Sequence, residues 1–133
     1  MSKFAEQTTE FKDAALLVKA LEEMGYDTVE IHKDGANLYG YEGDMRDEKA
    51  NIIVRRKYVG SASNDIGFRV TENGSYAAII SEFDSHKHNA AWVSKLKVSY
   101  AELAYKQKAM RMGLRFVGKT VENGKTQLQF IRQ

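Results

Sequence analysis

Two segments of the chain carry apolar residues at helical spacing. In the first, apolar side chains recur every three or four positions, at Ala14, Leu17, Leu21 and Met24. This spacing places them on one face of a helix. Asp13 is suited to cap the amino end and Gly25 to end the element, so the pattern predicts a helix over residues 13–24.

The second helical segment, residues 89–112, is longer and more basic. Its apolar stripe consists of Trp92, Leu96, Tyr100, Leu103 and Met110. Most of its basic residues lie off that stripe, at Lys95, Lys97, Lys106, Lys108 and Arg111. Gly113 is expected to end this helix.

Seven shorter segments have the apolar character of strands: 26–31, 36–41, 51–55, 65–70, 76–83, 114–121 and 126–131. Three of the segments between them contain Asp-Gly or Asn-Gly, at Lys33-Asp34-Gly35, Glu72-Asn73-Gly74-Ser75 and Glu122-Asn123-Gly124-Lys125. These dipeptides favour the positive φ angles of tight hairpins. The polar segments 43–49 and 60–64 have no such period and are expected to be loops.

Together these elements predict an α+β fold. We expect a mainly antiparallel sheet of six to seven strands with two helices packed on one face, and residues 1–133 as a single domain. Each helix ends on a glycine before a hairpin, so the helix-hairpin unit could be a pseudo-repeat. The matching positions are Met24-Gly25, Val29 and Gly35 against Met112-Gly113, Val117 and Gly124, with Glu10-Phe11 and Glu82-Phe83 preceding them. True duplication and a shared helix-end chemistry both explain the likeness.

Composition excludes several classes of site. The chain has no cysteine, so a disulfide framework, a thiolate metal site and a cysteine nucleophile are all excluded. Residues 1–10 lack the pattern of a secretory signal, and no stretch approaches the roughly 20 apolar residues of a membrane span, so we expect a cytoplasmic protein with no membrane contact. No cofactor is predicted.

Charge is distributed unevenly along the chain. Residues 1–85 hold 10 Lys/Arg and 16 Asp/Glu, a balance of −6, whereas residues 86–133 hold 10 and 2, a balance of +8. This asymmetry indicates an anion-binding face, unless the two halves neutralise each other across the fold.

The order of the short motifs resembles that of a known family. The relevant motifs are Met1-Ser2-x-Phe4, Ala20-Leu21, Gly25-Tyr26, Tyr39-Gly40-Tyr41-x-Gly43, Asp65-Ile66-Gly67-Phe68-Arg69, Tyr76, Tyr100-Ala101 and Gly113. In this order, over nearly the whole chain, they are similar to the hypothetical chloroplast reading frame 35 family of algal plastids, cyanobacteria and other bacteria. Lys3 departs from the family, where a His is expected, and residues 84–89 lack its aromatic content. Since that family has no established biochemical activity, the resemblance implies one compact domain and no mechanism.

The motif at residues 65–69 is the first candidate binding site. In a strand, Ile66, Phe68 and Val70 would face inward, leaving Asp65, Gly67 and Arg69 on one surface. Gly67 would let a ligand or another chain approach, and Arg69 could bind a carboxylate or phosphate, with Tyr41 on a neighbouring strand. The alternative is an Asp65–Arg69 ion pair on a solvated face, with Gly67 making room for a bulge or a neighbouring side chain.

The basic half of the chain is the second candidate site. Lys97, Lys108 and Arg111 could contact phosphates while Tyr105 stacks on a base. The alternative is a solvated outer helix face.

Residues for catalysis or metal binding are not apparent. His32, His86 and His88 supply no third metal ligand at a suitable spacing and are expected in solvated positions, so no metal site is predicted. No Ser lies in a nucleophile elbow.

Three functions therefore remain as hypotheses. The first is a non-enzymatic protein-binding or accessory module that uses the Arg69 face or a strand edge. The second is a nucleic-acid-binding protein, and the third is an enzyme or binder of small molecules or nucleotide-like ligands at Asp65, Arg69 and Tyr41. A protein partner is preferred to nucleic acid, and the oligomeric state is left open.

Overall fold

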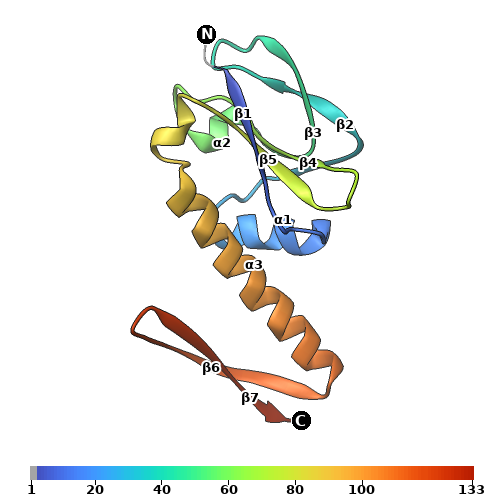
Figure 1. The fold of residues 1–133 in the computed structure, drawn as a ribbon, viewed down its shortest axis with the longest axis vertical. Helices are drawn as coiled ribbons and strands as arrows, with labels where there is room; N and C mark the ends of the chain where they lie inside the picture. The colour runs from blue at the N-terminus through green and yellow to red at the C-terminus, as the bar shows by residue number, and fades with distance from the viewer. Residues whose placement is uncertain (1–2) are drawn as a thin grey trace.

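The chain forms two antiparallel sheets and three α-helices in the computed structural model, which describes residues 3–133 (Figure 1). The elements in order are β1 (Phe4–Thr8), α1 (Ala14–Glu23), β2 (Glu30–Tyr39), β3 (Met45–Val54), α2 (Arg56–Val59), β4 (Ile66–Val70), β5 (Tyr76–Ser81), the 3-10 turn η1 (Asp84–His86), α3 (Ala90–Arg111), β6 (Leu114–Glu122) and β7 (Lys125–Arg132). The Met1-Ser2 part of the family-like motif lies outside the described residues.

The α+β class and the antiparallel pairing are confirmed. Five strands form one sheet in the order β1-β5-β4-β3-β2, and β6 pairs with β7 in a separate sheet. The seven strands of the structure are therefore divided between two sheets and do not form the single sheet that was expected. The reason is the 22-residue helix α3, which spans about 33 Å and carries the last hairpin away from the first sheet.

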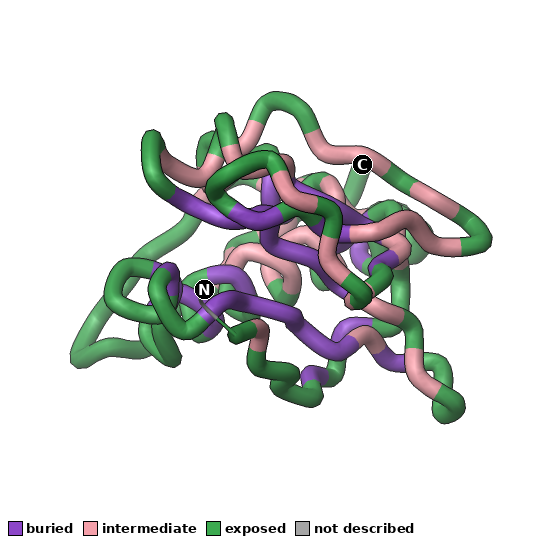
Figure 2. The backbone as a smooth tube through the Cα atoms, turned by 90° about the horizontal axis from the view of Figure 1, so that it is seen from above, coloured by how far each residue is buried: buried purple, intermediate pink, exposed green. Residues whose placement is uncertain are grey.

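Both predicted helices are confirmed, as is the predicted Asp13 cap, and Asn89 caps the second helix. Asp13 accepts a hydrogen bond from Leu16 N, and Asn89 accepts one from Trp92 N, which satisfies free N–H groups at each amino end. The helices cover one face of the larger sheet, and the core between them contains Phe11, Leu17, Leu21, Ile52, Val54, Ile66, Phe68, Ala78, Ile80, Trp92, Val93 and Leu96. In Figure 2 the buried segments run through the middle of the view and exposed segments surround them.

A smaller apolar cluster covers part of the opposite face. It consists of Leu38, Ala50, Ile53 and Ile79, with Phe4 and Ala36 packed against it. Gly67 lies beneath this cluster, where a Cβ atom would be 2.6 Å from Ala50 Cβ and 2.9 Å from Leu38 Cδ2. The glycine therefore allows the β2–β3 hairpin to pack closely on β4, in agreement with the alternative prediction that Gly67 makes room for a neighbouring side chain.

The predicted hairpin turn at Lys33-Asp34-Gly35 is wrong. Strand β2 continues through it with a shift of register between Ile31 and Ala36, and Gly35 adopts φ +84° within this bulge. Asn51 Nδ2 stabilises the bulge by donating to the carbonyl oxygens of His32 and Lys33. The chain instead turns at residues 40–44, where Gly43 N donates to Gly40 O.

Other boundaries also differ from expectation. Strand β3 already begins at Met45, within the expected loop, and β1 was not predicted because its short exposed sequence has no alternating pattern. The Gly35–Gly124 equivalence of the pseudo-repeat does not hold, since one lies in a bulge and the other in a hairpin turn. The hairpins around Asn73-Gly74 and Asn123-Gly124 are confirmed.

The molecule consists of a body, residues 3–97, and an arm, residues 98–133, which comprises the second half of α3 and the β6–β7 hairpin. The hairpin crosses the far end of α3, and the described ends of the chain lie at opposite ends of the molecule (Figure 1). Within residues 97–133 only Ala109 is buried, so the arm has almost no core of its own. None of the helices in residues 3–133 combines the length and the apolar character needed to cross a bilayer.

Candidate functional site

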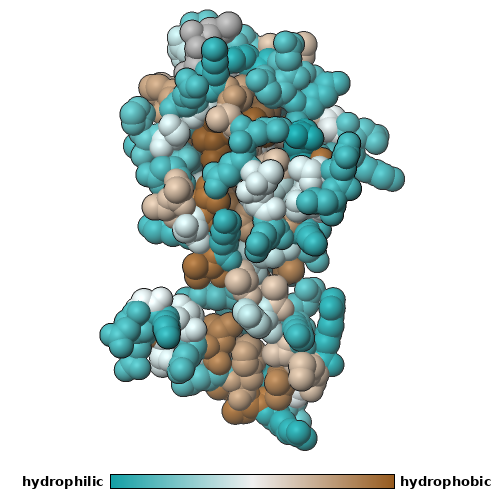
Figure 3. Space-filling view, viewed as in Figure 1, coloured by the Kyte–Doolittle hydropathy of each residue, from teal (hydrophilic) through white to brown (hydrophobic). Residues whose placement is uncertain are grey.

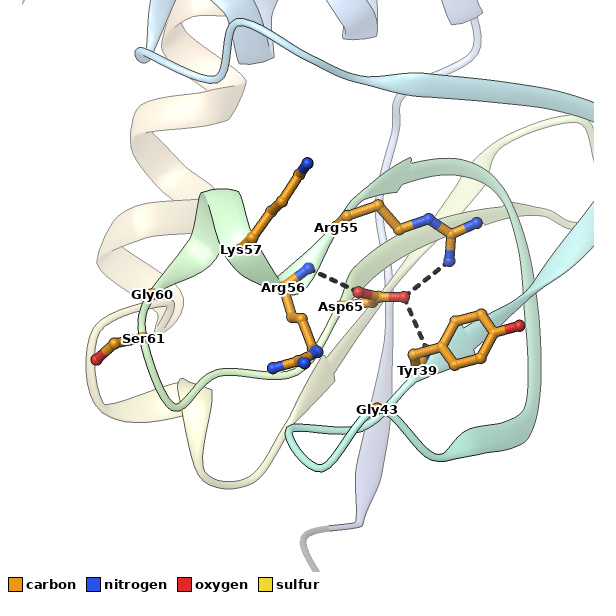
Figure 4. A pocket seen from close by; sticks show the side chains of 8 residues that line it. All are labelled: Tyr39, Gly43, Arg55, Arg56, Lys57, Gly60, Ser61 and Asp65. Carbon is orange, nitrogen blue, oxygen red and sulfur yellow. Dashed lines mark hydrogen bonds and ion pairs between the residues drawn. The ribbon is translucent and has the colours of Figure 1, made fainter.

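A pocket of about 590 Å³ opens beside α2, where the ends of β2, β3 and β4 meet (Figure 4). It is lined by Tyr39, Gly43, Arg55, Arg56, Lys57, Gly60, Ser61 and Asp65. Of the binding residues predicted from the sequence, only Asp65 lines it. The sequence signal for this pocket was the run of three cations at the end of a predicted strand, Arg55, Arg56 and Lys57. The sequence analysis did not identify this run as a site.

Asp65 holds three strand ends together at the bottom of the pocket. Its carboxylate accepts from Tyr39 N at 2.7 Å, from Arg55 Nη1 at 2.8 Å and from Arg56 N at 2.7 Å. The residue is only 1% exposed. The prediction that Asp65 lies on a surface with Arg69 is therefore wrong, because its charge is used to join β2, β3 and β4.

Arg55 is the partner that neutralises this buried carboxylate. Its guanidinium also forms two hydrogen bonds with Glu30, both at 2.9 Å, and donates to Asn37 O. The Glu30 hydrogen bonds raise the pKa of Arg55, and the same contacts lower the pKa of Glu30. These linked charges make a rigid polar wall on one side of the pocket.

Arg56 presents its side chain to the open part of the pocket. In Figure 4 its guanidinium lies between the Gly43 turn and the Gly60-Ser61 loop. Nη1 donates to Tyr41 O at 2.9 Å, so Tyr41 contributes a backbone oxygen while its own side chain is exposed. The pocket thus has a cationic rim over a neutralised floor.

The remaining residues of the 65–69 motif do not join this pocket. Gly67 is buried under Leu38 and Ala50, so the prediction that it is open to a ligand is wrong. Arg69 lies on the sheet face and pairs with Glu6, with Nε to Oε1 at 2.8 Å. Its ion-pair partner is thus Glu6 and not Asp65. The three residues do not form one site.

A second buried polar cluster, missed from the sequence, connects β4 to the start of α3. Asp84 Oδ2 accepts from Ser81 Oγ at 2.7 Å and from Asn64 N at 2.9 Å, and Asn64 Nδ2 donates to Ser81 Oγ. All three residues are buried. Because these groups hydrogen-bond to one another, their arrangement stabilises loops 60–65 and 82–89. No periodic pattern marked these residues.

His88 is buried, which contradicts the expectation that it is a solvated loop residue. Tyr26 Oη accepts from Trp92 Nε1 at 3.1 Å and bonds His88 Nε2 at 3.0 Å. The Tyr26 hydroxyl is therefore shared between Trp92 and His88. The other ring nitrogen of His88, Nδ1, has no hydrogen-bond partner among residues 3–133. Burial lowers the pKa of His88, against the opposing effect of Asp84.

The basic residues predicted for nucleic-acid binding are partly brought together. Lys97, Tyr105 and Lys108 line one groove of about 410 Å³ beside α3, whose floor includes Phe11 and Tyr100. Arg111 is exposed but is not among the residues that line this groove.

A second groove, of about 540 Å³, lies between α3 and the hairpin. It is lined by Val98, Ala101, Glu102, Tyr105, Gly124, Thr126, Leu128 and Phe130. Tyr105 and Ala101 line both grooves. Figure 3 shows apolar surface, in brown, gathered over the lower part of the molecule, where Figure 1 places the arm.

A comparison with protein families finds a match over most of the body and nearly all of the arm. The family model described as a protein of unknown function, DUF1257, matches residues 20–128. Neither the curated proteins nor the solved structures contain a match to this chain.

Proposed function

The chain belongs to the DUF1257 family of proteins of unknown function, and from its geometry we propose that it is a non-enzymatic protein-binding or accessory module whose contact surface is the arm. The observation that carries this proposal is the exposure of the arm's apolar residues. Tyr105, Met110, Met112 and Val121 are each 61–69% exposed. The more specific relationship to the hypothetical chloroplast reading frame 35 proteins is a prediction from the sequence motifs.

The arm has the properties of an uncovered interface. A single two-stranded hairpin is marginally stable in water, and the β6–β7 hairpin packs mainly against α3. Contiguous exposed apolar surface marks protein contacts, and aromatic and Met side chains are enriched in them. Tyr105, which lines both grooves, is the central aromatic side chain.

Contacts inside the body favour the same interpretation. The carboxylates of Asp65 and Asp84 and the Ser81 hydroxyl are engaged in hydrogen bonds that join neighbouring elements. These groups therefore stabilise the fold, and we propose that the arm supplies the surface for a partner.

Site-specific photo-crosslinking tests this proposal. A photoreactive phenylalanine analogue replaces Tyr105 in the arm, and in a matched control it replaces Phe83, an exposed aromatic residue of the body. In an extract of cells that naturally express the chain, we expect a protein adduct at Tyr105 and none at Phe83. Excess unmodified chain should suppress that adduct, while excess Tyr105→Glu chain should not. Equal adducts at both positions, or none at Tyr105, would contradict the proposal.

Nucleic-acid binding is a second candidate function, favoured by the groove that Lys97, Tyr105 and Lys108 share. Removing one cation that binds a phosphate should reduce the slope of log affinity against log salt by about 0.7–0.9. Lys97→Gln with Lys108→Gln should therefore lower the slope for an oligonucleotide by about 1.4–1.8, whereas Lys33→Gln should leave it unchanged. If the wild-type chain does not bind the oligonucleotide at low salt, this candidate is excluded.

A further inference from the structure

The chain exposes more surface than a compact monomer of its mass. Its accessible surface is 8540 Å² for 15.1 kDa, whereas the size relation for monomeric proteins gives about 7,100 Å². The difference, roughly 1,400 Å², exceeds the ~800 Å² that each partner contributes to a standard interface. The surplus is therefore large enough for one complete interface per chain.

The arm and one segment of the body are complementary in charge. The arm, residues 98–133, holds seven Lys/Arg and two Asp/Glu, a balance of +5. Residues 20–48, which we call the acidic segment, hold nine Asp/Glu and two Lys/Arg, a balance of −7. Exposed acids in this segment are Glu22, Glu23, Asp27, Asp34, Glu42 and Asp47.

The acidic segment also offers apolar contacts. Ile31 and Met45, on the paired strands β2 and β3, are 61% and 66% exposed. Strand β2 is one of the two edge strands of the larger sheet, so no strand of residues 3–133 pairs with its outer edge. The segment thus combines apolar anchors with negative charge, while the arm combines apolar anchors with positive charge.

Self-pairing of two arms is disfavoured by the same charges. The part of α3 in the arm contains three basic residues, Lys106, Lys108 and Arg111, and one acidic residue, Glu102. Two such helices in contact would place like charges together, which is destabilising. A contact between the arm of one copy and the acidic segment of another places +5 against −7 and avoids this repulsion.

We propose that a second copy of this chain covers the arm, in a reciprocal dimer where the arm of each copy lies against the acidic segment of the other. This inference rests on the proposed role of the arm as a protein-binding surface. Twofold symmetry makes both contacts identical and leaves neither arm uncovered. Burial of apolar groups drives the association, and the charges select the arm-to-body arrangement.

Sedimentation velocity of the full chain tests the dimer. At low ionic strength we expect a species of twice the 15.1 kDa chain mass. Because exposed charges are screened as the Debye length falls from ~10 Å at 0.1 M salt to ~3 Å at 1 M, association should weaken roughly tenfold or more over that range.

A charge swap tests the arrangement. An arm variant carries Lys108→Glu, Arg111→Glu and Arg115→Glu, and a body variant carries Glu22→Lys, Asp34→Lys, Glu42→Lys and Asp47→Lys, all at exposed positions. Each variant alone should be monomeric, because the first has an arm of −1 and an acidic segment of −7, whereas the second has an arm of +5 and a segment of +1. An equimolar mixture should restore the dimer, since each arm meets a body of opposite sign. The control Glu72→Lys, outside both surfaces, should leave association of the wild-type chain within about twofold.

The outcomes separate this inference from the proposed function. A chain that is still monomeric at a concentration of about 0.1 mM overturns the dimer. A mixture that stays monomeric, or a dimer insensitive to salt and charge reversal, overturns the reciprocal arrangement. If the Tyr105 crosslink identifies a different protein while the chain stays monomeric, the second copy is wrong and the protein-binding function stands. If no Tyr105 adduct forms, both are wrong.

Discussion

Replacing Asp65 with Asn removes one charge from the point where three strand ends meet. The carboxylate accepts from two backbone N–H groups, of Tyr39 and Arg56, and from the guanidinium of Arg55. Asn has a single acceptor oxygen and adds an NH₂ group that would face one of these donors. The variant therefore loses the ion pair and leaves at least one buried donor without a partner.

The size of the effect follows from burial. Removing one member of a buried ion pair costs about 3–5 kcal/mol of stability. Arg55 keeps its two hydrogen bonds to Glu30, so we expect the lower end, about 3 kcal/mol. With a urea m-value near 1.5 kcal/mol/M for a domain of this size, the midpoint should fall by about 2 M.

Arg69→Gln is the matched control from the same motif. Its ion pair with Glu6 joins side chains that are 41% and 47% exposed, and such pairs contribute about 0–1 kcal/mol. Its midpoint should therefore fall by less than about 0.7 M in urea. Circular dichroism at equilibrium measures both values. If the two variants lose equal stability, or Arg69→Gln loses more, the assignment of Asp65 as the structural charge of this motif is refuted.

Two further stability effects are expected. Gly67→Ala should cost about 1–3 kcal/mol by overpacking against Ala50, while Gly118→Ala, where the nearest atom is a flexible Gln129 Oε1 at 3.4 Å, should cost less than about 0.5 kcal/mol; equal urea midpoints would contradict the close packing. Because burial lowers the pKa of His88, the unfolded chain binds this proton more tightly. The stability linked to His88 is therefore complete above about pH 6.5 and falls as the pH drops below that value. Urea midpoints at several pH values should show this loss, and His88→Gln should reduce the slope; an unchanged slope would contradict the assignment.

Local sequence chemistry was sufficient for several elements. The helices around Leu17 and Trp92 were predicted because apolar spacing, the Asp13 cap and the glycine at the end of each helix act within a few residues. The hairpins at Asn73-Gly74 and Asn123-Gly124 were predicted for the same reason, since the turn is determined by the two residues in it. The prediction of a turn at Asp34-Gly35 was wrong because Asn51, which is distant in sequence, stabilises a bulge at that point.

The sequence by itself determined the class of fold, the helix limits, the charge asymmetry and the absence of thiol chemistry, because these depend on composition and on neighbours along the chain. Only the tertiary structure decided which charges meet. Asp65 pairs with Arg55, ten residues before it, and Arg69 with Glu6, because strand register brings these side chains together. The exposure of the arm could not be predicted from the sequence either, since the identity of an apolar residue does not show whether another part of the chain covers it. Whether Tyr105 is covered depends on the path of the whole chain.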